Sequence, residues 1–207
     1  MTIRLRPVLA VAVCAALAAG TGIAAAAPAP VCNLITDAKG DGTATILTDE
    51  GGPNDPSWDI LSADVASTKK GLTTVIRVDK LAASALTSPG GVQWRVNFTA
   101  GDKQLFTQVV STRSGLVGRY GYVDTLSRSL GGAPATVDMA KNEIRITVPD
   151  KGFAAQATIK KVGTTLTDMT ATAGRYYDLV AVTGSEPSDG TEVGKSYTTG
   201  TASCVTK

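Results

Sequence analysis

Histidine is missing from the 207-residue chain. Its absence excludes Ser-His-Asp and Cys-His catalysis, and also zinc, copper and non-haem iron sites that use histidine ligands. Cysteine is scarce as well, because Cys14 lies in the N-terminal apolar segment and only Cys32 and Cys204 remain. If these two are paired, haem and iron–sulfur ligation would have only methionine or tyrosine to use. The chemistry open to the chain is therefore narrow.

An excess of either charge is also lacking. The chain has 20 Lys+Arg and 18 Asp+Glu, and removing Arg4 and Arg6 with an N-terminal signal leaves 18 of each. The only basic clusters are the pairs Lys69-Lys70 and Lys160-Lys161, which we interpret as ordinary solvated pairs. Nucleic acids and anionic membranes need a basic face. We expect no nucleic acid and, after signal cleavage, no membrane as partner, which leaves an extracellular glycan or protein.

The N-terminus has the pattern of a secretory signal peptide. Two arginines without an acid precede an apolar, alanine-rich run at residues 7–19, and small residues follow at 20–29. That run is too short to span a bilayer. We predict a signal peptide at residues 1–26, with a retained anchor as the alternative. Residues 27–207 then form a single domain of a secreted protein.

The two remaining cysteines lie near the two ends of the mature chain. An even pair in an exported protein predicts a disulfide between Cys32 and Cys204. It would tie the first strand to the last and close a loop of about 170 residues. The chain-entropy model gives such a link about 5 kcal/mol as an upper figure. The alternative is two free thiols.

Apolar residues recur with period two from Asp59 onward, which is typical of strands with one buried face. Such runs occupy residues 72–78, 92–98, 104–112, 116–123, 136–139, 143–148 and 176–182, and a β-prone run lies at 43–48. Short loops predict two hairpins, one joining the runs at 92–98 and 104–112 and one joining those at 136–139 and 143–148. We therefore predict an all-β fold, an antiparallel, jelly-roll-like β-sandwich.

Two late segments are less regular. Between Phe153 and Ala173 we allow at most one short helix, because four residues there have helical spacing although threonine is abundant: Leu166, Met169, Thr170 and Ala173. The sequence GSEPSDGTEVG at 184–194 predicts a surface loop.

The densest acidic region spans residues 37–65. It holds seven carboxylates against one lysine: Asp37, Asp41, Asp49, Glu50, Asp55, Asp59 and Asp64. Calcium takes six to eight oxygen ligands from such loops. We predict a structural calcium on Asp37, Asp41 and Asp59, and on Asp178 of a late strand. Asp59 shares the inward line of its strand with Leu61, Ala63 and Val65. The alternative is that Asp37 and Asp41 only cap turns by hydrogen bonds.

The aromatic residues offer one candidate for ligand binding. Trp58 lies in the acidic region, where stacking on a sugar and burial in the core both remain open, whereas Trp94 shares a strand face with apolar residues and belongs to the core. Four tyrosines could line a groove or fill the core: Tyr120, Tyr122, Tyr176 and Tyr177. Acid–base catalysis could use only a pair of carboxylates, and the sequence does not single out a pair. We expect a protein without enzymatic activity.

Three motifs suggest a family: Asp37-Ala-Lys-Gly40-Asp41, Asn54-Asp-Pro-Ser-Trp-Asp59-Ile60 and Leu72-Thr-Thr-Val75-Ile76-Arg77-Val78. Their order resembles the β-sandwich domains of exported actinobacterial proteins, some of which stand alone and some of which are appended to secreted proteases. The wider group is similar to DOMON-type domains and family-nine carbohydrate-binding modules. The resemblance implies a jelly-roll sandwich, often with a structural calcium, and ligands that range from sugars to haem. The missing histidine argues against haem.

Together these features predict a secreted binding module for a sugar or a cell-wall glycan. Two alternatives stay open: an extracellular protein-interaction or protease-associated accessory domain, and a glycosidase that uses carboxylates.

Overall fold

The computed structural model describes residues 29–42, 55–86, 92–112, 114–123, 128–154, 159–179 and 182–206, without the side chains of 154, 176–179, 182–188 and 206. The predicted signal peptide at 1–26 and the β-prone run at 43–48 lie outside the described residues. Within the described parts, no helix has the length and apolar character needed to cross a membrane.

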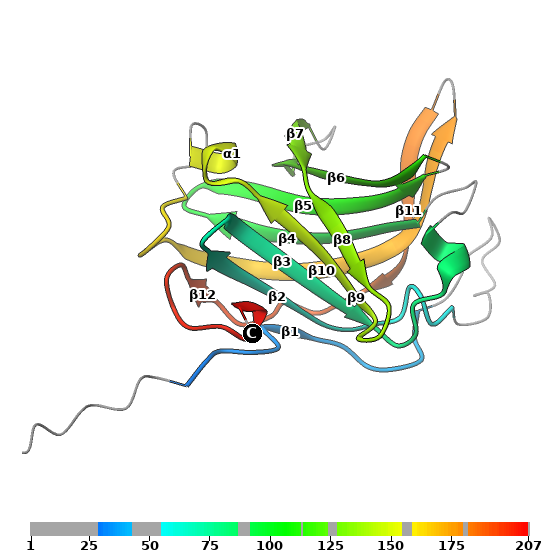
Figure 1. Cartoon of the computed structure of the whole chain (residues 1–207), viewed down its shortest axis with the longest axis horizontal. Coiled ribbons are helices and arrows are strands. Elements are labelled where there is room, and N and C mark those ends of the chain that lie inside the picture. Colours follow the sequence, from blue (N-terminus) through cyan, green and yellow to red (C-terminus); the bar gives the residue numbers. More distant parts are fainter. Residues whose placement is uncertain are drawn as a thin grey trace, which may run out of the picture.

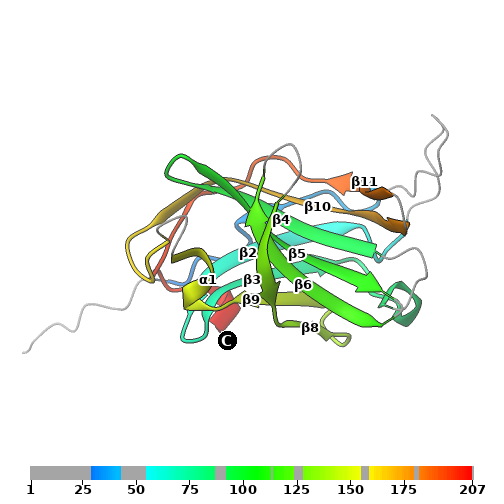
Figure 2. The same ribbon diagram turned by 90° about the horizontal axis from the view of Figure 1, so that it is seen from above.

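Two antiparallel sheets are stacked face to face, as Figures 1 and 2 show from two directions. The five-stranded sheet has the order β1-β2-β3-β9-β8. Its strands are β1 (Ile35–Thr36), β2 (Ile60–Thr68), β3 (Gly71–Val78), β9 (Glu143–Val148) and β8 (Ala135–Asp138). The short edge strands β1 and β8 leave few unpaired backbone groups open to another chain.

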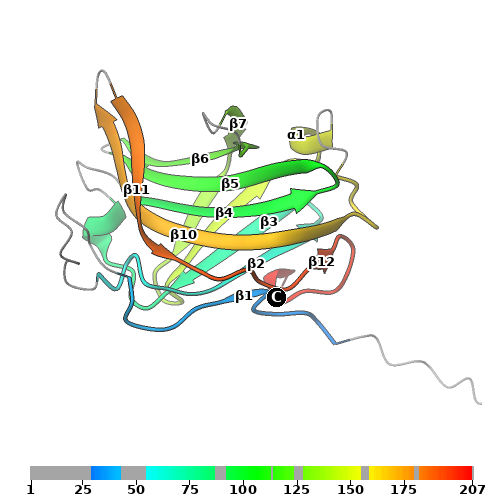
Figure 3. The same ribbon diagram turned by 180° about the vertical axis from the view of Figure 1, so that it is seen from behind.

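The seven-stranded sheet forms the second layer and faces the reader in Figure 3. It has the order β11-β10-β4-β5-β6-β7, and β12 also pairs with β10. Its strands are β4 (Val92–Ala100), β5 (Lys103–Thr112), β6 (Gly115–Tyr122), β7 (Ser129–Ala133), β10 (Thr165–Leu179), β11 (Val182–Gly190) and β12 (Tyr197–Thr198). Both predicted hairpins, β4–β5 and β8–β9, are present, and the all-β sandwich is confirmed.

The core lies between the sheets and is filled by the inward side chains of both. Trp94 is fully buried there, as predicted, and its indole N–H donates to the backbone oxygen of Ser57 at 2.9 Å. A hydroxyl contact also crosses the layers, because Thr107 Oγ1 donates to Thr74 Oγ1 at 2.9 Å. Truncating a buried aromatic such as Trp94 to alanine typically costs about 3–5 kcal/mol.

The prediction of a short helix between Phe153 and Ala173 is wrong for the residues with helical spacing, because they form a strand. Residues 165–173 belong to β10, and the short helix α1 (Asp150–Ala154) comes before it. The pairing of β10 with β4 shifts between Thr167 and Thr170, where Asp168 has a φ of 50°. This bulge inserts an extra residue, so that both Leu166 and Met169 face inward. Their separation of three positions resembles the spacing of buried residues in a helix.

The prediction of a surface loop at 184–194 is also wrong for residues 184–190, which pair with β10 as part of β11. Proline is tolerated in this strand because β11 lies at the edge of its sheet. Pro187 stands opposite Gly174, at a register shift that acts as a second irregularity. Residues typical of turns led to the loop prediction, although they belong to an edge strand.

The predicted disulfide between Cys32 and Cys204 is present and links residues 172 positions apart. Val31 and Ser203 form a parallel bridge beside it, and the N–H of Val31 donates to the oxygen of Ala202 at 2.9 Å. Cys204 begins a short 3-10 helix, η2 (Cys204–Thr206), which contacts β2 and β3. The two ends of the domain are thus joined on the outer face of the five-stranded sheet.

Candidate metal centre

The acidic turn after β1 is shaped by its own backbone. Gly40 has a φ of 94°, which favours glycine because it has no side chain to clash. The N–H of Asp37 donates to the oxygen of Leu61 at 3.2 Å, which anchors the turn beside β2, and the N–H of Ala38 donates to Asp37 Oδ1 at 3.0 Å. Asp37 therefore caps the turn through one oxygen, as the turn-capping alternative expects, and its other oxygen remains.

Asp59 lies at the middle of this turn and is fully buried. Its Oδ2 accepts the N–H of Gly40 at 2.7 Å, and Gly42 packs so closely on its backbone that a Cβ at Gly42 would lie 2.8 Å from the Asp59 Cα. The predicted inward line holds at Ala63 and Val65, which are fully buried, but not at Leu61, because a register shift between Ile60 and Ser62 turns Ile60 inward instead. Asp59 is buried by the wrapped turn rather than by strand parity.

The third segment of the centre is the end of β11. Asp189 is 7% exposed, and its Oδ2 accepts the N–H of Ile60 at 2.6 Å. One carboxylate oxygen each of Asp37, Asp41 and Asp189 lies within 4.8 Å of the others, so this cluster could hold a metal ion. In Figure 3, β11 descends to the loops that follow β1 and precede β2. The cluster therefore spans both sheets.

The electrostatics of the centre reflect three acids at close range. Burial raises the pKa of Asp189 to about 6, and the nearby Asp37 and Asp41 add to this rise against the N–H groups of Ile60 and Gly190. Burial also raises the pKa of Asp37, and Asp41 and Asp59 contribute in the same direction. Both carboxyl groups hold their protons more tightly than solvated carboxyl groups do, because they are buried and lie close to other acids, and a nearby counter-ion would oppose this effect.

The lysine within the acidic turn does not supply that counter-ion. Lys39 Nζ lies 2.6 Å from a carboxylate oxygen of Asp79, and this hydrogen bond raises the pKa of Lys39. Among the described residues, Asp37 Oδ2 is buried and has no hydrogen-bond partner. A buried carboxylate oxygen without a partner is costly, so the centre is arranged for something that binds oxygen.

The structure brings together only part of the predicted ligand set. Asp37 and Asp41 belong to the cluster, Asp59 bonds the same turn, and the side chain of Asp178 lies outside the described residues. Asp189 was missed because it stands in the segment interpreted as a loop. Its only sequence signal is the Asp-Gly pair within that segment.

Trp58, the residue considered for sugar stacking, is 8% exposed and packs in the core cluster. Its ring therefore presents little surface on which a sugar could stack. A glycan proposal has to rest on other residues.

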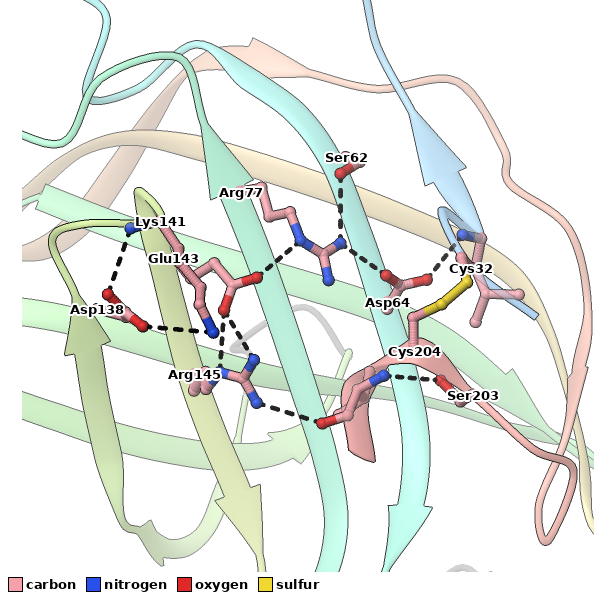
Figure 4. A network of polar contacts seen from close by, with 12 residues as sticks. Cys32, Ser62, Asp64, Arg77, Asp138, Lys141, Glu143, Arg145, Ser203 and Cys204 are labelled. Carbon is pink, nitrogen blue, oxygen red and sulfur yellow. Dashed lines mark hydrogen bonds and ion pairs between the residues drawn. A yellow bond between two sulfur atoms is a disulfide. The ribbon is translucent and has the colours of Figure 1, made fainter. Parts of the chain in front are cut away.

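A second charged cluster lies on the outer face of the five-stranded sheet, and Figure 4 shows it. Arg77 donates from Nη1 to Asp64 Oδ2 at 2.6 Å and from Nε to Glu143 Oε1 at 2.9 Å. Arg145 donates from Nη2 to Glu143 Oε2 at 2.7 Å and from Nη1 to the backbone oxygen of Val205 at 3.3 Å. The other oxygen of Asp64 accepts the N–H of Leu34 at 3.0 Å. This network attaches both chain ends to the sheet.

The charges in this network balance one another. Burial acts to lower the pKa of Arg77, but its hydrogen bonds to Asp64 and Glu143 outweigh burial, so the pKa is raised overall. Burial acts to raise the pKa of Glu143, but the two arginines hold it below its usual range. Each carboxylate of the network thus has a guanidinium partner. The lowered pKa of Glu143 makes it a poor proton donor for a glycosidase, which needs one carboxyl with a raised pKa.

No protein-family model matches the chain, and no curated protein matches it significantly. Function must therefore be inferred from the geometry of the domain itself.

Proposed function

We propose that the protein is an exported binding module without enzymatic activity, whose fold is reinforced by a calcium ion at Asp37, Asp41 and Asp189. The observation that carries the calcium is the convergence of three carboxylate oxygens within 4.8 Å from segments of both sheets. An ion at this point would link the turn after β1 to the end of β11. It would act as a staple between the layers, much as the disulfide links the chain ends.

The ligand set suits calcium better than a transition metal. The groups present are oxygens, and the described part of the chain offers no thiolate beyond the disulfide, while the whole sequence has no imidazole. Calcium accepts irregular loops with carboxylates, backbone carbonyls and water, whereas magnesium demands a near-octahedral shell and keeps several waters. The partnerless Oδ2 of Asp37 and the nearby Asp59 would complete such a site.

Thermal unfolding of the mature protein tests this proposal. A ligand that binds only the folded state adds about 2.7 kcal/mol at a hundredfold excess over Kd, which for about 180 residues corresponds to roughly 5–10 °C. We expect calcium to raise the melting temperature by that amount, EDTA to reverse it, and magnesium to do less.

A matched pair of variants makes the test specific. Asp189→Asn keeps the side chain's shape and an oxygen for the N–H of Ile60 but removes one charge from the cluster, so the calcium response should shrink strongly. Asp102→Asn removes one charge from a solvated turn whose side chain is 83% exposed, and it should leave the response intact. Equal responses in both variants, or none in the parent, would leave turn capping as the only role of these acids.

The ligand class we propose is an extracellular glycan. The disulfide suits an oxidising compartment, the predicted signal peptide suits export, and the resemblance to carbohydrate-binding modules points to sugars. Pull-down of the mature protein on insoluble polysaccharides and a glycan array would test this, with aryl-glycoside turnover as the check on activity. Binding to a secreted protein but to no glycan would instead favour the accessory-domain alternative.

A further inference from the structure

The two lysine pairs that look unremarkable in the sequence become neighbours in the fold. Lys69 and Lys70 form the turn between β2 and β3, and Lys161 Nζ lies 3.5 Å from the backbone oxygen of Lys69. The carboxylate at this point is Asp150, 3.4 Å from Lys161 Nζ. The two lysine pairs are therefore neighbours in space, although about ninety positions separate them in the sequence.

Lys69 and Lys70 line a groove on the outer face of the five-stranded sheet, the face that Figure 1 turns toward the reader. The groove has a volume of about 840 Å³. Its floor consists of threonines and Arg145, its rims include Pro134 and Pro149, and no carboxylate lines it. Because Glu143 balances Arg145, the positive charge available to a ligand comes from the lysines.

Within the described residues, neither Lys69 nor Lys70 forms an ion pair, so both ammonium groups are available to a ligand. Their exposure means that they attract an anion without the desolvation penalty of a buried charge. The groove thus meets the electrostatic requirement for an anionic ligand at one end.

The threonines that line the groove favour a ligand that carries hydrogen-bond donors. Thr68 Oγ1 donates to the backbone oxygen of Gly71 at 3.0 Å, which uses its single proton. Thr73 must then donate in its 3.3 Å contact with Thr68, and Thr147 must donate in its 3.0 Å contact with Thr73. Thr147 is left with lone pairs only, so the end of this row offers acceptors to the hydroxyl groups of a ligand.

Building on the proposed glycan-binding function, we propose that this groove binds an anionic polysaccharide, with sugar hydroxyls on Thr147 and acidic groups near Lys69 and Lys70. A ligand that combines O–H donors with negative charges matches both Thr147 and the two lysines of the groove. The lining contains no aromatic side chain on which a nucleobase could stack. The negative groups can be uronate carboxylates or phosphodiesters, since both pair with ammonium groups.

Equilibrium binding to the mature, calcium-loaded protein tests the inference, with polygalacturonate, a polyglycerol-phosphate teichoic acid and neutral dextran as ligands. We expect binding to one or both polyanions, weakened by salt, and much weaker binding to dextran. The two polyanions decide between carboxylate and phosphodiester as the recognised group. Binding to neutral glycans alone would overturn the groove proposal and keep the glycan-binding function, whereas binding to no glycan would overturn both.

Variants locate the site. Lys69→Gln with Lys70→Gln should weaken polyanion binding about fivefold to tenfold, since each solvent-exposed charge contributes only modestly to binding. The control is Lys80→Gln with Lys195→Gln, two exposed lysines outside the groove, which should change affinity less than twofold. Equal losses in both double variants would indicate nonspecific charge attraction and overturn the site.

Thr147→Val separates a glycan from a plain polyanion. Loss of one hydrogen-bond acceptor should weaken polygalacturonate or teichoic acid binding about threefold to tenfold and leave binding of polyglutamate, which has no hydroxyl groups, unchanged. If polyglutamate binds the parent as tightly as the glycans do and Thr147→Val affects none of them, the groove recognises acidic peptides and the glycan assignment is wrong.

Discussion

Arg77 holds two buried or half-buried carboxylates at once, and its removal gives the clearest stability test of the fold. Asp64 is fully buried, and its Oδ2 lies 2.6 Å from Arg77 Nη1. Arg77→Met keeps the aliphatic stem but leaves Asp64 with its bond to the N–H of Leu34 and without its arginine partner. Breaking a buried ion pair from one side typically costs about 3–5 kcal/mol.

The loss is smaller at the other end of the network. Glu143 keeps Arg145, whose Nη2 lies 2.7 Å from Oε2, so little of the cost of Arg77→Met arises there. Arg145→Met should cost only about 1–2 kcal/mol, because Glu143 retains Arg77 and the other lost bond is the 3.3 Å contact to Val205. Urea unfolding, with both variants and parent measured at equal calcium, gives these free energies of unfolding.

The double variant Arg77→Met with Asp64→Asn decides the cause. The amide oxygen still accepts the N–H of Leu34 but carries no charge, so the double variant should be about 1–2 kcal/mol more stable than Arg77→Met alone. If Arg77→Met costs less than about 1 kcal/mol, or if adding Asp64→Asn lowers stability further, the buried ion pair does not anchor the N-terminal segment as described.

Two further outcomes follow from the acidic centre and the disulfide. In EDTA the free energy of unfolding should rise by about 1 kcal/mol between pH 7 and pH 5 through Asp189, because its pKa of about 6 in the folded state lies above its unfolded value of 3.8 and the folded state takes up the proton first as the pH falls. Urea unfolding across this range should show a gain about 1 kcal/mol larger in the parent than in Asp189→Asn, in which Asp37 still has a raised pKa; equal pH profiles would contradict it. Cys204→Ser should lower the free energy of unfolding by about 2–5 kcal/mol with an unchanged circular dichroism spectrum, because the link acts mainly by restricting the unfolded chain; two alkylatable thiols in the unreduced parent would refute the link itself.

Period two was a sufficient guide wherever the strand pairing is regular. The runs around Trp94 and Ile146 alternate cleanly, and β4, β5 and β9 lie within a residue or two of their predicted bounds. Bulges defeat the same method, because one extra residue changes the parity of everything after it. At Asp168 the extra residue produces a spacing that resembles a helix. At Leu61 the register shift changes which side chains face inward, so the alternation that was used to place Asp59 does not hold there.

The candidate sites depend on contacts that no local pattern contains. Asp37 and Asp41 could be selected because crowded acids around Gly40 are visible in the sequence. Asp189 joins them only because β11 ends beside the start of β2, a pairing between segments about 130 positions apart. Asp64 looks like another solvated acid of the same region until the chain ends cover it.

The balanced charge of the chain hides a separation of charge along one strand. β2 begins at Ile60, whose N–H bonds the acidic centre, and ends at Thr68, next to the lysine turn. Eight steps of about 3.3 Å between these nine residues place the two ends of β2 roughly 26 Å apart, which is about three times the screening length of about 8 Å at physiological salt. The acids therefore cannot neutralise the lysines, and the lysines cannot relieve the crowding of the acids. A cation bound at one end and an anion bound at the other would satisfy the two ends independently, so the near balance of 20 basic and 18 acidic residues is compatible with binding both.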